Sequence, residues 1–195
     1  MKVIPSVLLV LVTVVSGSMQ LLASDSSTPP GPREQALMEA AFNGDLAAVR
    51  DLVSAGADFH AGDADRRTAL MWAAFNGHTE VVAFLLDKDA ALDAKDSNGR
   101  TALMYASSGP FTETVELQLK EGSEVNLQGT LEGFTALMTA AAEGQLEVVR
   151  VLLENGADPK LMDKDGDTAM TFARQNGHDA VVDLLVNPPA AKPDR

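Results

Sequence analysis

The stretch Thr68-Ala69-Leu70-Met71 returns along the chain as Thr101-Ala102-Leu103-Met104, as Thr135-Ala136-Leu137-Met138 and, shortened, as Thr168-Ala169-Met170. The copies are 33, 34 and 33 residues apart, and a degenerate copy, Gln35-Ala36-Leu37-Met38, lies 33 residues before the first. A fixed period of this length is typical of small supersecondary units that stack into an array. The spacing therefore predicts five stacked units.

Each unit predicts two short helices. Thr68 is a good helix N-cap and the Ala, Leu and Met that follow favour helix, so we expect a first helix to about Asn76. Gly77 ends it, and a second helix is expected from about Thr79 to Leu86. The buried stripe of that second helix consists of Val81, Val82, Leu85 and Leu86. Because neither helix can bury its apolar face alone, neighbouring units must stack.

The repeated unit resembles the ankyrin repeat. The motif, the glycine after it, the Val-Val-x-x-Leu-Leu run and the closing Gly-Ala-Asp stand in register over about residues 33–187. The family's motif is Thr-Pro-Leu-His, and here Ala replaces Pro and Met replaces His. The resemblance implies an all-α repeat solenoid of five stacked helix-turn-helix units with short β-hairpin-like fingers, in which the fingers and first helices line a concave face. The expected units are 33–62, 63–95, 96–129, 130–162 and 163–187.

The N-terminus has the pattern of a targeting segment. Lys2 precedes the apolar run Val7–Val15, and Ser16-Gly17-Ser18 offers small residues to a peptidase. We expect residues 1–24 to be a cleaved signal peptide, with an uncleaved anchor over residues 3–23 as the alternative. A proline-rich linker is expected over 25–32 and a tail over 188–195. The expected location is periplasmic or secreted, in the envelope of a bacterium.

Composition limits the function classes. The 195 residues are 46% apolar and only 5% aromatic, as expected for thin layers of Ala, Leu and Val, and the net charge is −13. A polyanion does not bind nucleic acid or an anionic membrane through its overall field. The chain has no cysteine, which excludes disulfides, thiolate nucleophiles and zinc–cysteine sites. We expect a monomer with a protein partner.

The sequence offers no catalytic residue, metal site or cofactor site. The three histidines are scattered, and His78 and His178 are expected to cap second helices. Aspartates recur in the fingers, as at Asp163, Asp165 and Asp167, where Asx-turns are the expected role. A calcium loop is the weaker alternative there, because the later glutamate is missing.

Two further features concern the core. Met38, Met71, Met104 and Met138 form a ladder with one methionine per unit, which we interpret as packing between units. The third unit is irregular. Pro110 replaces the interhelix glycine, Gln118 occupies a leucine position, and one extra residue precedes Thr135. Neutral drift, a functional site and a weak joint between two halves all remain open interpretations.

Candidate partner-binding residues are those that the resemblance places on the concave face. Phe and Arg are prominent among them, as in energetic hot spots of protein interfaces. Phe42 and Phe75 could instead pack on each other, and Trp72 and Tyr105 are interpreted as packing residues. The candidates are Phe42, Arg67, Phe75, Asn76, Arg100, Leu131, Phe134 and Glu143.

The sequence thus favours a non-enzymatic protein-binding scaffold of the bacterial cell envelope. The resemblance adds an expected role in stress protection, linked to peroxide and catalase. A toxin-immunity or enzyme-inhibitor protein is one alternative. A metal-dependent factor or enzyme that uses the acidic fingers is the other.

Overall fold

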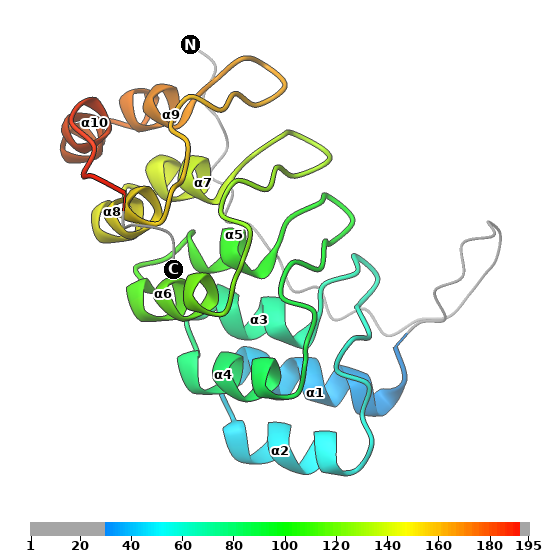
Figure 1. Cartoon of the computed structure of the whole chain (residues 1–195). Coiled ribbons are helices and arrows are strands. Elements are labelled where there is room, and N and C mark those ends of the chain that lie inside the picture. The colour runs from blue at the N-terminus through cyan, green and yellow to red at the C-terminus, as the bar shows by residue number, and fades with distance from the viewer. Residues whose placement is uncertain (1–29, 192–195) are drawn as a thin grey trace, which may run out of the picture.

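The structure, a computed structural model, describes residues 30–191, and these residues fold into five helix pairs stacked in one column (Figure 1). The expected signal peptide, most of the linker and the last four residues of the tail lie outside the described residues. The first helices are α1 (Pro32–Asn43), α3 (Ala69–Phe75), α5 (Ala102–Ala106), α7 (Ala136–Ala142) and α9 (Ala169–Gln175). The second helices are α2 (Leu46–Ser54), α4 (Thr79–Asp87), α6 (Thr112–Lys120), α8 (Leu146–Glu154) and α10 (Asp179–Val186).

The predicted all-α repeat solenoid is confirmed. First helices pack on first helices and second helices on second helices, so that the stack has two layers. The fingers between units project together to one side, and the turns within each helix pair lie at the opposite end of the helices (Figure 1). Strand structure in the described fingers is limited to one isolated antiparallel bridge between Gly62 and Thr68.

The threonine of the repeated motif caps the first helix of units two to five, as predicted. The hydroxyls of Thr68, Thr101, Thr135 and Thr168 each accept a hydrogen bond from the backbone N–H three residues later, at 3.4, 3.4, 3.1 and 3.3 Å. The first unit lacks this cap, and α1 begins at Pro32, one residue before the expected start. A proline is tolerated at the first helical position because that position needs no backbone N–H.

The core is a column of small and aliphatic side chains. Leu37, Leu70, Leu103 and Leu137 are fully buried at the centre of the first-helix layer. The methionine ladder is buried beside them, with exposed fractions of 7%, 2%, 3% and 2% for Met38, Met71, Met104 and Met138. The interpretation of the ladder as packing is therefore confirmed.

The prediction that His78 and His178 cap second helices is wrong. Both residues stand at the N-cap position of α4 and α10, but neither side chain makes a capping hydrogen bond. The ring of His78 lies instead over Gly44 of the preceding unit, and its Nε2 is 2.9 Å from the carbonyl oxygen of Phe42. The histidines therefore connect units, because the open space above a glycine is large enough for an imidazole ring.

Within residues 30–191, no helix is both long enough and apolar enough to cross a membrane.

Candidate protein-binding surface

Four aromatic side chains form a continuous row along the first-helix layer of units one to three. Phe42 at the end of α1 contacts Trp72 of α3 edge to face, with ring centroids 5.6 Å apart. Trp72 contacts Phe75 at 6.3 Å, and Phe75 contacts Tyr105 of α5 at 6.1 Å, also edge to face. We call Phe42, Trp72, Phe75 and Tyr105 the aromatic row. Such contacts add stability beyond the area buried, so the rings are held in fixed orientations.

Two arginines from the fingers cover two members of the row. The guanidinium of Arg67 lies 4.4 Å from the ring centroid of Trp72, and that of Arg100 lies 4.8 Å from the ring centroid of Tyr105. Both distances are within the range of attractive cation–π contacts. The same residue position, immediately before the capping threonine, supplies both arginines. The row is therefore built from repeated positions of the unit and not from one loop.

Finger aspartates hold these arginines in place. Arg67 donates from Nε to Asp63 at 2.8 Å, and its Nη2 is 2.9 Å from Asp65. In the next finger, Arg100 donates from Nε to Asp96 at 3.0 Å. Each guanidinium is thus fixed by a carboxylate on one side and an aromatic face on the other.

Asp96 organises the third unit's part of the row. Its side chain is fully buried, and its Oδ2 accepts hydrogen bonds from the Tyr105 hydroxyl at 2.7 Å and from Arg100. Burial alone would raise the pKa of Asp96, but hydrogen bonds from the Arg100 backbone and from Tyr105, with the charge of Arg100, lower this pKa below its usual value. Burial and the bond to Asp96 raise the pKa of Tyr105. The Tyr105 hydroxyl therefore remains a protonated donor.

The row is partly open to solvent. Phe42 is 37% exposed, and the other three rings are half-buried. Trp72 lies between Phe42 and Phe75 and contacts both, so those two phenylalanines do not simply pack on each other. The sequence pattern predicts Trp72 and Tyr105 as packing residues, whereas the structure makes both members of the row, with Trp72 inside it and Tyr105 at its end. The available signal was the arginine five residues before each of these rings.

Four of the candidate residues meet at the row: Phe42, Arg67, Phe75 and Arg100. Phe134 does not join them, since it is half-buried and packs edge to face on buried Phe172 of α9, at 5.2 Å. Leu131 is 55% exposed at a fingertip, and Glu143 is exposed at the end of α7. Asn76 donates its side-chain N–H to the carbonyl of Phe42 at 2.7 Å, so it links units one and two.

The aspartates of the fingers stabilise turns, as predicted. Asp63 and Asp163 each accept hydrogen bonds from the backbone N–H groups two and four residues later, at 2.8 to 3.0 Å. Among the described residues, no group of three or more His, Asp or Glu side chains is arranged to hold a metal ion. The carboxylates of Asp63 and Asp163 are thus engaged in the fold itself, whereas Asp165 and Asp167 contribute their backbone N–H groups to the turn at Asp163.

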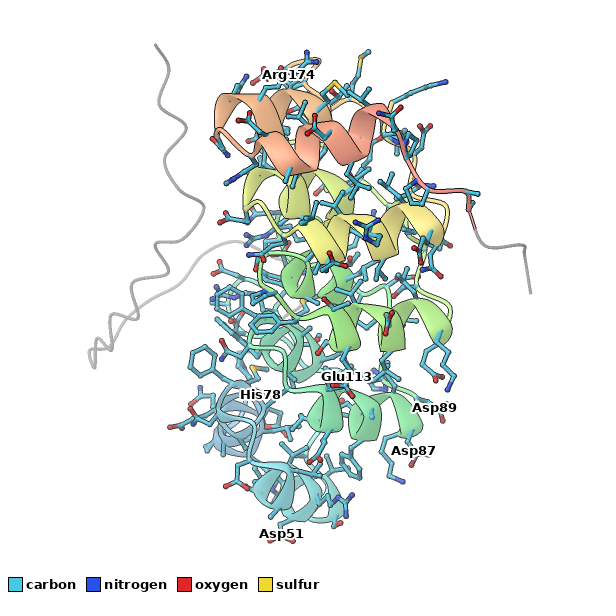
Figure 2. All side chains as sticks on the ribbon, turned by 90° about the vertical axis from the view of Figure 1, so that its left-hand side faces the viewer. Asp51, His78, Asp87, Asp89, Glu113 and Arg174 are labelled. Carbon is cyan, nitrogen blue, oxygen red and sulfur yellow. The ribbon has the colours of Figure 1, made fainter. Side chains whose placement is uncertain are left out.

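A groove of about 690 Å³ lies elsewhere, between second helices α4 and α6. Its polar lining includes His78, Glu80, Glu113, Glu116 and Lys120. His78 and Glu113 lie on the same face of the stack (Figure 2). The groove is separate from the aromatic row, since its lining contains none of the four rings.

The chain is similar to ankyrin repeat proteins. A family model described as "Ankyrin repeats (3 copies)" matches residues 37–117 and 107–195. Ankyrin repeat family A protein 2 of Mus musculus is 53% identical over 47 residues, which is 24% of this chain and 15% of that protein. Ankyrin repeat domain-containing protein 63 of Homo sapiens is 37% identical over 70 residues, 36% of this chain and 18% of that protein. The E3 ubiquitin-protein ligase mind-bomb of Drosophila melanogaster is 44% identical over 52 residues, 27% of this chain and 4% of that protein. The matched segments thus span less than a fifth of each of these relatives.

Proposed function

This chain belongs to the ankyrin repeat family, and from that premise we propose that it is a non-enzymatic scaffold that binds one partner protein through the aromatic row. Ankyrin repeats are generally protein–protein interaction scaffolds, so the class of ligand follows from the family. The location of the binding site within the fold is our inference, drawn from the aromatic row and its two arginines. Trp, Tyr and Arg are the residue types that most often carry the binding energy of protein interfaces.

The observation that carries the proposal is the fixed arrangement of the partly exposed row. Its four rings contact one another in sequence, and two of them also carry an arginine held by carboxylates. Side chains that are already ordered lose little conformational freedom when a partner docks.

The proposed site of action is the bacterial cell envelope. Lys2, the apolar run Val7–Val15 and the small residues after it support export by a cleaved signal peptide. Within this proposal, stress protection linked to peroxide and catalase is the first expected role, on the strength of the family resemblance alone. An immunity or inhibitor role against a toxin or an enzyme is the second, and the identity of the captured partner distinguishes the two.

Affinity capture with matched variants tests the proposal. The full chain and its Phe42→Ala/Phe75→Ala variant are immobilised, and the proteins retained from an envelope extract are identified and quantified. The control variant Met162→Ala/Val186→Ala removes two side chains that are 60% and 55% exposed away from the row. We expect one protein to be retained by the parent and the control and lost from the row variant. Equal retention of that protein by the parent, the control variant and the row variant would show that the row is not the binding site.

Folding is checked on the same samples. Circular dichroism of the row variant should remain that of a folded chain, while its melting temperature should fall, because Phe75 is half-buried and its edge-to-face contacts with Trp72 and Tyr105 are lost. If the row variant unfolds, the single variant Phe42→Ala replaces it in the capture experiment.

A further inference from the structure

The first and last joints of the stack share one device, which we call the latch. In the second unit, the side-chain N–H of Asn76 and the Nε2 of His78 both reach the carbonyl oxygen of Phe42, at 2.7 and 2.9 Å. In the fifth unit, Asn176 and His178 reach the carbonyl of Ala142 in the same way, at 2.7 and 3.0 Å. A carbonyl oxygen only accepts hydrogen bonds, so Nε2 carries the proton in both histidines. Each latch therefore ties two units at the turn end of the helices.

The joint between units three and four lacks the latch. Glu143 and Gln145 stand at the positions of Asn176 and His178. Of these two side chains, Gln145 alone reaches the carbonyl of Ser108, at 3.4 Å. A hydrogen bond of this length is weak in comparison with the four bonds of the two latches.

The joint between units two and three also lacks the latch but is filled in another way. Gly109 and Phe111 occupy the two donor positions, and the Phe111 ring lies against Gly77. The hydroxyls of Thr79 and Thr114 are hydrogen-bonded at 2.7 Å across the same joint. Apolar contact and one short hydrogen bond thus replace the latch there.

Pro110 explains why the fourth unit has no imidazole. A Cβ added to Gly44 would lie 2.5 Å from the His78 ring, and one added to Gly144 would lie 2.6 Å from the His178 ring. The histidine of a latch therefore requires a glycine in the preceding unit. In the third unit that position is Pro110, whose ring would occupy the space that the imidazole needs.

The joint between units three and four also has the least extensive packing in the first-helix layer. Helix α5 is the shortest of the described helices, with five residues, and it packs less extensively on α7 than any other neighbouring pair of first helices packs. Hydrogen bonds connect the two units at the finger end. The Leu131 N–H donates to the carbonyl of Asn98 at 3.0 Å, and the side-chain N–H of Gln128 donates to the carbonyl of Met162 at 2.8 Å. Helices α6 and α8 pack on each other more extensively than any other neighbouring pair of second helices, so the second-helix layer is the fixed side of this joint.

We propose that the joint between units three and four is a hinge, about which the aromatic row on units one to three and the first-helix face of units four and five change their relative angle. The fingers and second helices keep contact during this motion, while the turn end between Ser108 and Gln145 opens. Hinge motion of this kind follows from packing in discrete bodies and takes place in microseconds to milliseconds. The inference does not depend on the row being the binding site.

Spin-label distances test the hinge in the full chain, which has no native cysteine to interfere. Ala47, Glu113 and Ala180 are exposed at the same position of α2, α6 and α10. Labels at 113 and 180 span the third and fourth joints, and labels at 47 and 113 span the first and second joints. We expect the distance distribution of the 113/180 pair to be broader than that of the 47/113 pair, in frozen solution.

A latched variant completes the test. Pro110→Gly, Glu143→Asn and Gln145→His together supply the glycine, the asparagine and the histidine of the other latches. We expect this triple variant to narrow the 113/180 distribution, whereas Pro110→Gly alone leaves it broad. Equal widths for the two label pairs in the parent chain would overturn the hinge, and so would an unchanged width in a folded triple variant. If the triple variant does not fold, the comparison of the two pairs in the parent decides.

Discussion

Replacing Gln118 by leucine is expected to stabilise the protein. Gln118 is fully buried in α6, where the neighbouring units have Leu85 and Leu152, both also fully buried. Its side-chain N–H reaches the carbonyl of Thr114 at only 3.4 Å, and its Oε1 has no hydrogen-bond partner. The amide is therefore buried at a cost that is scarcely offset.

The magnitude follows from the unpaired oxygen. Leaving a buried polar group without a partner costs about 1–3 kcal/mol, and the weak bond to Thr114 returns only a small part of that cost. Leucine has a volume close to that of glutamine and is already accommodated at this position in two other units. We therefore expect Gln118→Leu to raise the free energy of unfolding by about 1–3 kcal/mol.

Urea denaturation followed by circular dichroism measures this change. The midpoint should rise while the slope of the free energy against urea concentration stays constant, because the surface exposed on unfolding hardly changes. The reverse substitution, Leu85→Gln, is the matched control, and it should lower the midpoint. A Gln118→Leu midpoint equal to or below that of the parent would refute the reasoning and would show that the Gln118 carbonyl is satisfied in solution.

Three further perturbations follow from burial and charge. Met138→Lys places a charge without a partner between units at a 2% exposed position and should cost several kcal/mol in urea melts; a change below about 0.5 kcal/mol would contradict the packing role. In the Asp96→Asn variant, the free energy of unfolding should decrease less than that of the parent as the pH is lowered into the acid range. The lowered pKa of Asp96 means that its carboxylate stabilises the fold above the unfolded-state pKa of about 3.9 and loses this effect as the pH falls through the folded-state value. Melts between neutral pH and pH 3 that are parallel for parent and variant would exclude this role. Phe134→Ala should lower the melting temperature, because the ring packs on buried Phe172, whereas an unchanged melt would return Phe134 to the exposed binding candidates.

The repeat period made most of the fold predictable from the sequence. The threonine caps, the paired helices and the buried methionine ladder all follow from local chemistry that recurs every 33 or 34 residues. One copy of the unit therefore predicts the others, and the helices begin and end close to the predicted residues. The irregular third unit was also visible, since Pro110 and Gln118 break the repeat at the level of single residues.

Contacts between units were much less predictable. His78 and His178 were assigned to their own helices, but the geometry of the stack places each ring over a glycine of the preceding unit. In the same way, Phe75 in a first helix and Phe134 in a finger were both predicted to bind a partner. In the structure Phe75 joins the aromatic row, whereas Phe134 packs on Phe172. Such differences depend on the side chain that a neighbouring unit presents, and a pattern read within one unit does not contain that information.

Trp72 gives the most direct test of the proposed binding surface, because it is the only tryptophan of the chain and lies within the aromatic row. The captured partner is titrated into the full chain while tryptophan emission and acrylamide quenching are recorded, and the Trp72→Phe variant supplies the partner's own signal for subtraction. The account predicts a saturable shift of Trp72 emission to shorter wavelength and reduced quenching, with the midpoint that an independent binding assay gives. Unchanged Trp72 emission and quenching at partner concentrations that saturate the independent assay would contradict it.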